Sequence, residues 1–152
     1  RNTMLRIGRN LFVHAGLSAR LLERNLEMDT LNARMSEGLY RTSKERREDP
    51  TLEFLYRSAG PVWYRGMVCT DEKYDPLTPE QTDALLRRYD ADRLLIGHTI
   101  FPDISTFHDG RVIAVNVQNE RNRRKNRGRA VLIEGSRISV VGNRGVKRVL
   151  EE

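Results

Sequence analysis

Short apolar runs bounded by polar residues recur along this chain and predict its strands. One run, "NLFVH", covers residues 10–14, and a second, "RLLIGH", covers residues 93–98. Unbroken apolar runs of this length are typical of strands that are buried on both faces. Further strands are predicted at 111–117, at 129–135 and 137–142 as a hairpin, and at 145–150.

Apolar residues at helical spacing predict two helical segments after the first strand, over residues 18–25 and 29–41. Asp29 and Thr30 are good N-cap residues and favour the start of the second segment. Farther along, Pro50 favours the first turn of a short helix that Gly60 would close.

The clearest helix is predicted over residues 78–90. Thr78 suits its N-cap, Pro79 suits its first position, and Gln81 stands three residues after the cap. The order of elements indicates an α/β protein with helices first and an antiparallel-leaning sheet afterwards. No internal repeat or interdomain linker interrupts the sequence, so residues 1–152 are expected to form part of one domain.

The composition argues against a membrane protein and against a disulfide-rich protein. Hydrophobic residues make up 38% and charged residues 32%, and no apolar run approaches the length of a membrane span. The single cysteine, Cys69, excludes an internal disulfide and a paired-cysteine metal site, and is read as a bystander. We therefore expect a cytoplasmic protein without a membrane partner.

The net charge of +6 directs attention to the densest basic run, "ERNRRKNRGR", at residues 120–129. This run contains no aromatic residue that would stack on a base, so nucleic acid is not the favoured partner. It is predicted to be a solvated loop, with attraction of phosphate or of a protein partner as the alternative.

Two of the three histidines end predicted strands: His14 ends "LFVH" and His98 ends "RLLIGH". Ligands of α/β proteins collect at the carboxyl ends of strands, where adjacent strands would place these two side chains together. Imidazole nitrogens ligate zinc, manganese and iron. Metal ligation and a hydrogen-bonded histidine pair near the core are both open on this pattern.

The segment "WYRG" supplies the next candidate, Arg65, which lies between an aromatic pair and a glycine. Its planar guanidinium could bind a phosphate, or it could stack on Trp63 or Tyr64 at the surface. His108 lies in the turn "FHDGR" and is expected to be structural or exposed. Asp103 follows His98 closely enough to be a candidate for orienting its ring.

Taken in order, "LFVHAGLS", "GPVWYRG", "LLIGHTIFPDISTFHDGRVIAVNV" and "RAVLIEGSRISVVGNRGVKRVL" resemble the carboxyl-terminal half of a calcineurin-like metallophosphoesterase. The spacing is most similar to the Shewanella-like branch of the phosphoprotein phosphatases, with the diadenosine tetraphosphatases as close relatives. The resemblance implies half of a β-sandwich flanked by helices, in α/β/β/α layers.

The resemblance also implies an activity: metal-dependent hydrolysis of phosphate esters at two divalent ions, manganese, iron or zinc. His14 and His98 match ligands of one ion. Arg65 resembles a phosphate-binding arginine, with Tyr64 as its neighbour at the substrate. The expected partners are a phosphorylated substrate and the amino-terminal half of the same domain.

The chain departs from this family in one large respect. The aspartates, the asparagine–histidine motif and the catalytic histidine of the family's first half are absent, and "VNVQN" places Asn116 and Gln118 where relatives often carry ligands. The sequence starts at Arg1 without methionine, so a fragment that is inactive by itself is expected. The alternatives are a degenerate phosphatase that binds an anionic partner, and a dinucleoside polyphosphate hydrolase.

Overall fold

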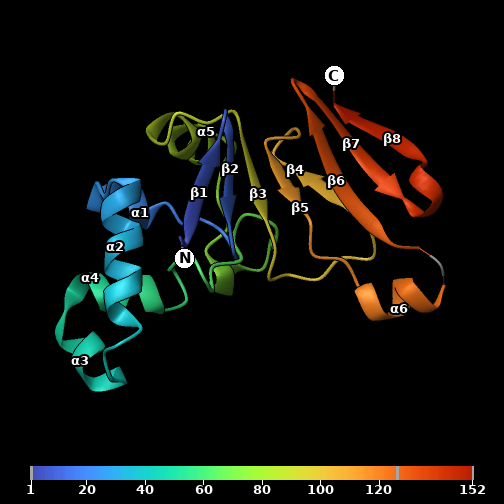
Figure 1. Ribbon diagram of the computed structural model, residues 1–152. Helices are drawn as coiled ribbons and strands as arrows, with labels where there is room; N and C mark the ends of the chain where they lie inside the picture. Colours follow the sequence, from blue (N-terminus) through green and yellow to red (C-terminus); the bar gives the residue numbers. More distant parts are fainter. Residues whose placement is uncertain (1, 126, 152) are drawn as a thin grey trace.

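The computed structural model describes residues 2–125 and 127–151, and it arranges them in three layers: helices, a five-stranded sheet and a three-stranded sheet (Figure 1). The strands are β1 Met4–Ile7, β2 Asn10–Val13, β3 Arg93–Ile96, β4 Ser105–Phe107, β5 Val112–Ala114, β6 Arg129–Glu134, β7 Arg137–Gly142 and β8 Lys147–Glu151. The helices are α1 Arg20–Arg24, α2 Met28–Gly38, α3 Ser43–Glu48, α4 Pro50–Tyr56, α5 Pro79–Arg88 and α6 Asn119–Arg124, with 3-10 turns η1 Glu72–Tyr74 and η2 Asn143–Gly145.

The larger sheet has the strand order β1-β2-β3-β5-β4. Its three central strands are parallel, and only the edge strands β1 and β4 are antiparallel to their neighbours. The antiparallel sheet expected from the sequence was therefore wrong for this layer. The register of β2 and β3 pairs Val13 with Ile96, so both strands end at the same edge of the sheet.

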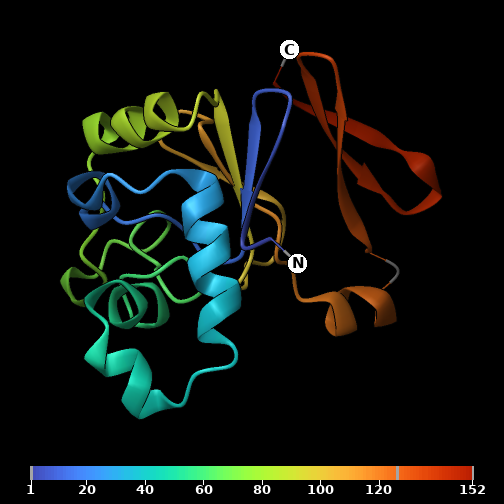
Figure 2. The same ribbon diagram turned by 60° about the vertical axis from the view of Figure 1, so that its left-hand side comes forward.

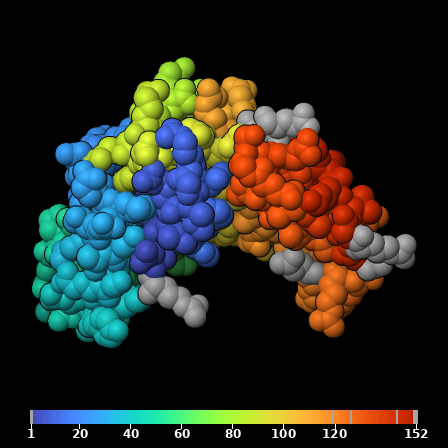
Figure 3. Space-filling view, turned by 45° about the horizontal axis from the view of Figure 1, so that its top comes forward, coloured from blue at the N-terminus to red at the C-terminus, as the bar shows by residue number. Residues whose placement is uncertain are grey.

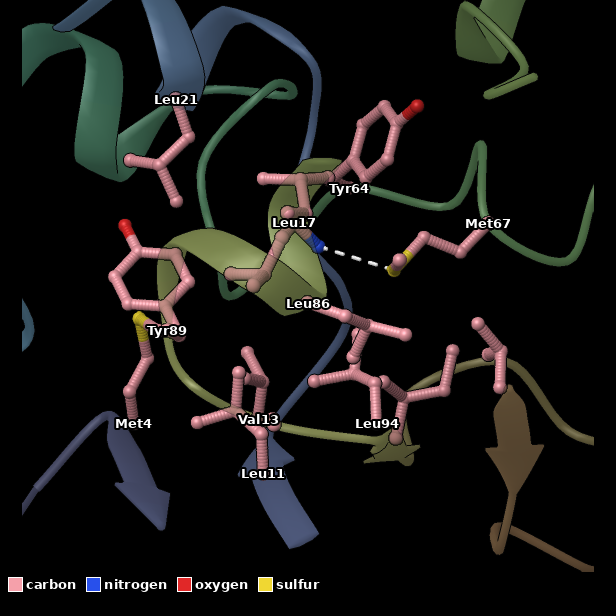
Figure 4. Close-up of a cluster of buried hydrophobic side chains, with 14 of the residues drawn as sticks. Met4, Leu11, Val13, Leu17, Leu21, Tyr64, Met67, Leu86, Tyr89 and Leu94 are labelled. Carbon is pink, nitrogen blue, oxygen red and sulfur yellow. Dashed lines mark hydrogen bonds between the residues drawn. The ribbon is translucent and has the colours of Figure 1, made fainter. Parts of the chain in front are cut away.

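The unbroken apolar runs are explained by layers on both faces of this sheet. In β2, Leu11 and Val13 pack on the helices, whereas Phe12, between them, contacts the three-stranded sheet. In β3, Leu94 faces the helices and Leu95 faces the other sheet. Figure 4 shows the helical side of this core, where Leu17, Leu86 and Tyr89 surround the β2 side chains.

The three-stranded sheet confirms the predicted hairpin. Strands β6 and β7 pair antiparallel from Arg129↔Gly142 to Glu134↔Arg137, and Gly135 adopts a positive φ of 64° in the turn. Strand β8 adds to β7. Ile138 and Val140 bury against the five-stranded sheet, and this contact holds the two sheets together.

The predicted helices agree with the structure to different degrees. Helix α5 begins as predicted: the Thr78 side chain accepts from the Gln81 backbone and the Gln81 side chain from the Thr78 backbone. Pro50 opens α4, but that helix ends at Tyr56, before Gly60. Helix α2 begins at Met28, one residue before the expected Asp29 cap.

Among the described residues, four α-helices and strands were not predicted: β1, α3, β4 and α6. Strand β1 is short and partly exposed, and it is tied to α2 by the buried Asn32. The Asn32 amide accepts from the backbone of Thr3 and Met4 and donates to the Met4 carbonyl. The basic run expected to be a loop contains α6, in which Arg124 pairs with Glu120.

The α/β class is confirmed, and the described residues form three layers. A second helical layer outside the three-stranded sheet is not found in the parts of the chain that the structure describes. Helix α6 instead lies beyond one end of that sheet in both ribbon views (Figure 2). The assignment of residues 1–152 to one domain stays a prediction.

Candidate functional site

The candidate site begins where the parallel strands β2 and β3 end. His14 directly follows β2, and His98 follows β3 after Gly97. The Gly97 backbone donates to the His14 carbonyl over 2.9 Å, and a Cβ on Gly97 would lie 3.3 Å from that oxygen. His98 takes a positive φ of 59°, so the chain turns sharply here. The predicted meeting of the two histidines is confirmed.

A second segment, the loop that leads from α4 to α5, lies against this edge. The backbone amides of Ala15 and Gly16 donate to the Pro61 carbonyl, at 3.0 and 3.4 Å. A Cβ on Gly16 would lie 3.1 Å from the Tyr64 carbonyl, so this close approach favours glycine. The Leu17 amide contacts the Met67 sulfur at 3.3 Å, the dashed line in Figure 4.

The loop brings Arg65 to the histidine pair. The Arg65 Nη2 lies 3.1 Å from His98 Nε2, and His98 Nδ1 lies 3.1 Å from His14 Nε2. In the described part of the chain, no carboxylate pairs with Arg65. Its guanidinium instead lies 5.9 Å from the Tyr74 ring, and the Trp63 ring meets His98 edge-on at 5.5 Å. Arg65 therefore does not stack on Trp63 or Tyr64.

These contacts determine the protonation of His98. A guanidinium only donates, so His98 Nε2 accepts from Arg65 through its lone pair. The proton of neutral His98 must then be on Nδ1, from which it is donated to His14 Nε2. The three side chains form a directed chain, Arg65 to His98 to His14.

The environment lowers the pKa of His98 below its ordinary value of 6.5. Burial is the largest cause, followed by the positive charge of Arg65 and then by His14. The folded state thus favours neutral His98. The stability from this preference is fully present above pH 6.5 and is lost as pH falls through the lower folded pKa.

We expect an NMR titration of His98 ring signals to give a midpoint below 6.5. In the variant Arg65→Gln the midpoint should rise, because one of the charges that oppose protonation is gone. The variant Arg87→Gln, at an exposed position on α5, serves as the control and should leave the midpoint unchanged. An unchanged midpoint in Arg65→Gln would contradict the contact between the guanidinium and His98.

The geometry corrects the prediction of two divalent metal ions. The described residues contain no group of three or more histidine, cysteine or acidic side chains placed to hold a metal. The facing nitrogens of His14 and His98 are already engaged with each other, and protein metal sites usually supply three or four ligands. The donor set does not fit a metal, and the open alternative, a hydrogen-bonded pair, is what the structure contains.

Tyr64 has a buried position beneath the site. Its side chain is 2% exposed, its hydroxyl donates to the Asp75 carbonyl at 2.5 Å, and burial raises its pKa far above 10. A Cβ on Gly66 would lie 2.2 Å from that hydroxyl, so glycine allows the approach. Tyr64 thereby positions Arg65, and its direct contact with substrate stays a prediction.

Two further residues have structural roles. His108 lies 3.2 Å from the Thr82 hydroxyl and 3.0 Å from the Met67 carbonyl, which confirms the structural role expected for it. Asp103 does not orient His98. It accepts from Arg129 Nε at 2.9 Å and from the Ile104 amide, so the role predicted from its nearness in sequence was wrong.

Two hollows adjoin the site. A cleft of about 760 Å³ lies between the sheets, with mainly apolar walls that include Phe12, Leu95 and Val131, and it reaches His14. Figure 3 shows the β1–β2 hairpin and the three-stranded sheet on either side of a hollow in the surface. The second hollow, of about 810 Å³, has Trp63 and Arg65 in its wall. Only the second offers the cationic groups that an anion requires.

Comparison with known proteins shows which solved structures have a similar fold. No protein-family model and no curated protein matches the chain. Solved structures do: one of a cold-active protein tyrosine phosphatase has a TM-score of 0.87 and 26% identity, covering 100% of this chain and 43% of that one. Another, of the cold-active protein-tyrosine phosphatase of a psychrophilic Shewanella species, has a TM-score of 0.86 and 26% identity, covering 99% and 43%.

These matches correct the family expected from the motifs. The structures that this chain resembles over its whole length are described as protein tyrosine phosphatases, so the assignment to the calcineurin-like metallophosphoesterases was wrong. The likeness gives no support to the expectation that the isolated chain is inactive. The chain spans less than half the length of the structures it matches.

The remaining predictions concern partners and location. No helix among the described residues is long and apolar enough to cross a membrane. The phosphorylated substrate and an amino-terminal half as partners, and the absence of nucleic acid, stay predictions. So does the interpretation of Cys69 as a bystander.

Proposed function

We propose that this chain carries the phosphate-binding and proton-transfer groups of a phosphate-ester hydrolase that acts on aryl phosphates such as phosphotyrosine. The observation that supports it most is the directed chain from Arg65 through His98 to His14. It lies in a fold similar throughout to structures described as protein tyrosine phosphatases.

In the proposed complex, the Arg65 guanidinium binds two non-bridging oxygens of the phosphate, for which its planar fork is suited. This contact removes Arg65 from His98 Nε2 and frees the lone pair of that nitrogen. The cation thus binds the substrate and at the same time makes the base available.

Hydrolysis then exchanges one oxygen at phosphorus. A water oxygen bonds to phosphorus as the bond from phosphorus to the phenolic oxygen breaks. His98 Nε2 accepts a proton from the water, while Nδ1 keeps its hydrogen bond to His14 Nε2. The proton then passes to the leaving phenolate, so that the products are the phenol and inorganic phosphate.

The test is release of p-nitrophenol from p-nitrophenyl phosphate by the isolated chain. We expect the variant His98→Gln to lower kcat by about 10²- to 10⁴-fold, the usual contribution of a positioned acid–base group. The matched control is His108→Gln, which changes a histidine bound to Thr82 and Met67 and should retain kcat.

Circular dichroism would show that each variant is folded. Equal turnover by His98→Gln and by the unchanged chain would contradict the proposed role of His98. Turnover by the folded chain no faster than the buffer reaction would contradict the function itself.

A further inference from the structure

The second hollow extends the site away from the histidine pair. Its wall includes Trp63, which contacts the His98 ring, and Arg65, which contacts His98 Nε2. A substrate phosphate on Arg65 would therefore lie at the rim of this cavity. The volume, about 810 Å³, is within the range of sites that hold whole drug-sized ligands, so the cavity has room for more than a phosphate.

The cavity is strongly cationic. Besides Arg65, its wall contains Arg20, Arg57 and Lys73, and Asp75 is the one acidic side chain among the described residues that line it. The four basic and one acidic side chains give a formal charge of +3. Such a concentration of one sign in a concave wall attracts groups of the opposite charge.

These cations are held only loosely by the protein's own carboxylates. Arg20 Nε lies 4.0 Å from Asp75, and Arg57 Nη2 lies 3.7 Å from Glu53. Lys73 pairs with Asp71 at 2.8 Å, but its side chain is 64% exposed. Exposed pairs of this kind contribute little to stability, so the three cations are available to a ligand.

Aromatic side chains complete the wall. Trp63 is 55% exposed, although tryptophan is usually well covered, and Tyr74 lies beneath Lys73 Nζ at 4.9 Å. An apolar surface beside cations suits a side chain that has a methylene stem and an anionic end. Glutamate and aspartate in a peptide have this chemistry, whereas inorganic phosphate does not use the aromatic surface.

We propose that this cavity is a subsite for an acidic side chain that flanks the phosphorylated residue of a peptide substrate. Arg57 and Lys73 bind the carboxylate, while Trp63 covers its stem. The inference rests on the proposed function, because it takes Arg65 as the phosphate site. It adds to the proposed function a preference for substrates in which an acidic residue flanks the phosphorylated one.

The test is equilibrium binding, which does not require turnover. Two fluorescent peptides carry difluorophosphonomethyl-phenylalanine, a non-hydrolysable phosphotyrosine analogue, flanked by glutamate in one and by glutamine in the other. Fluorescence anisotropy at low salt should give about tenfold tighter binding of the glutamate peptide, the effect of roughly one charge-assisted hydrogen bond. Added salt should reduce this preference.

The double variant Arg57→Gln/Lys73→Gln should reduce the preference to less than about twofold, the difference that neutral side chains leave. The control Arg87→Gln should keep it. A third peptide with phosphoserine at the flanking position distinguishes a carboxylate from a second phosphate as the favoured anion. Equal binding of the glutamate and glutamine peptides, or a preference that survives in the double variant, would overturn the inference.

Turnover of p-nitrophenyl phosphate separates the two proposals. This small substrate does not reach the subsite, so its kcat should be the same in the double variant and in the unchanged chain. If the chain prefers the glutamate peptide but releases no p-nitrophenol, the result supports the subsite and contradicts the proposed function. Failure of both peptides to bind would overturn the inference.

Discussion

Replacing Arg65 with alanine is expected to lower kcat/KM for p-nitrophenyl phosphate by about 10²- to 10³-fold, the usual effect of removing one preorganised donor from a developing anion. Arg65 is the cation in direct contact with His98, and no ion pair with a carboxylate of the described residues holds it. The phosphate would therefore lose both its charge partner and its bidentate donor.

Two further variants separate the effect of the Arg65 charge from the effect of its planar guanidinium. Arg65→Lys keeps the charge but not the planar fork, so it should recover only part of the activity. Arg87→Gln removes an exposed arginine from α5 and should keep full activity. Because Arg65 is only half-buried, all three variants should melt close to the unchanged chain. Full activity of folded Arg65→Ala would exclude Arg65 from the phosphate site.

Replacing Leu94 with alanine is expected to cost about 2–5 kcal/mol in the free energy of unfolding, as for other large-to-small changes in a core. Leu94 is 1% exposed on the central strand β3, and its register partners are Leu11 and Val112, both fully buried. A domain of this size should lose roughly 4 to 20 °C in melting temperature. Urea unfolding followed by circular dichroism measures the change.

The control for this prediction is Leu5→Ala on the edge strand β1. Leu5 is 44% exposed, so the same chemical change should cost less than about 1 kcal/mol. Equal losses in the two variants would contradict the central position of β3 in the core. A Leu94→Ala chain that stays folded should also lose activity, because β3 carries His98 to the site.

Local signals in the sequence predicted the elements that have local causes. The capping residues Thr78 and Gln81 identified the start of α5, and Gly135 identified the hairpin turn between β6 and β7. The apolar runs at 10–14 and 93–98 identified β2 and β3 as strands buried on both faces. These signals act within a few residues, so no tertiary contact is needed to interpret them.

The elements that were missed depend on distant contacts. Strand β1 is buried only at Met4, and it is stabilised by Asn32, 28 residues away. Helix α3 has the capping pair Thr42 and Glu45 but no buried residue, so it produces no apolar pattern. A search for capping boxes in polar segments would have found α3, whereas no local signal indicates the partner of Asn32.

The candidate site also has features that the sequence predicted and features that it did not. That His14 and His98 follow buried strands is evident from the sequence, and parallel neighbours at one sheet edge brought them together as predicted. The metal ions were wrong because the described residues bring no further ligands to the two histidines. The role of Asp103 was wrong because nearness in sequence does not show which groups a side chain contacts.

The sequence by itself determined the α/β class, the two histidine-bearing strands and Arg65 as a candidate for phosphate, because these depend on short apolar runs and residue chemistry. Only the tertiary structure decided that Arg65 donates to His98, that Tyr64 is buried beneath it, and that Arg20, Arg57 and Lys73 share one cavity. Those residues come from separate segments, and only folding of the chain brings them together.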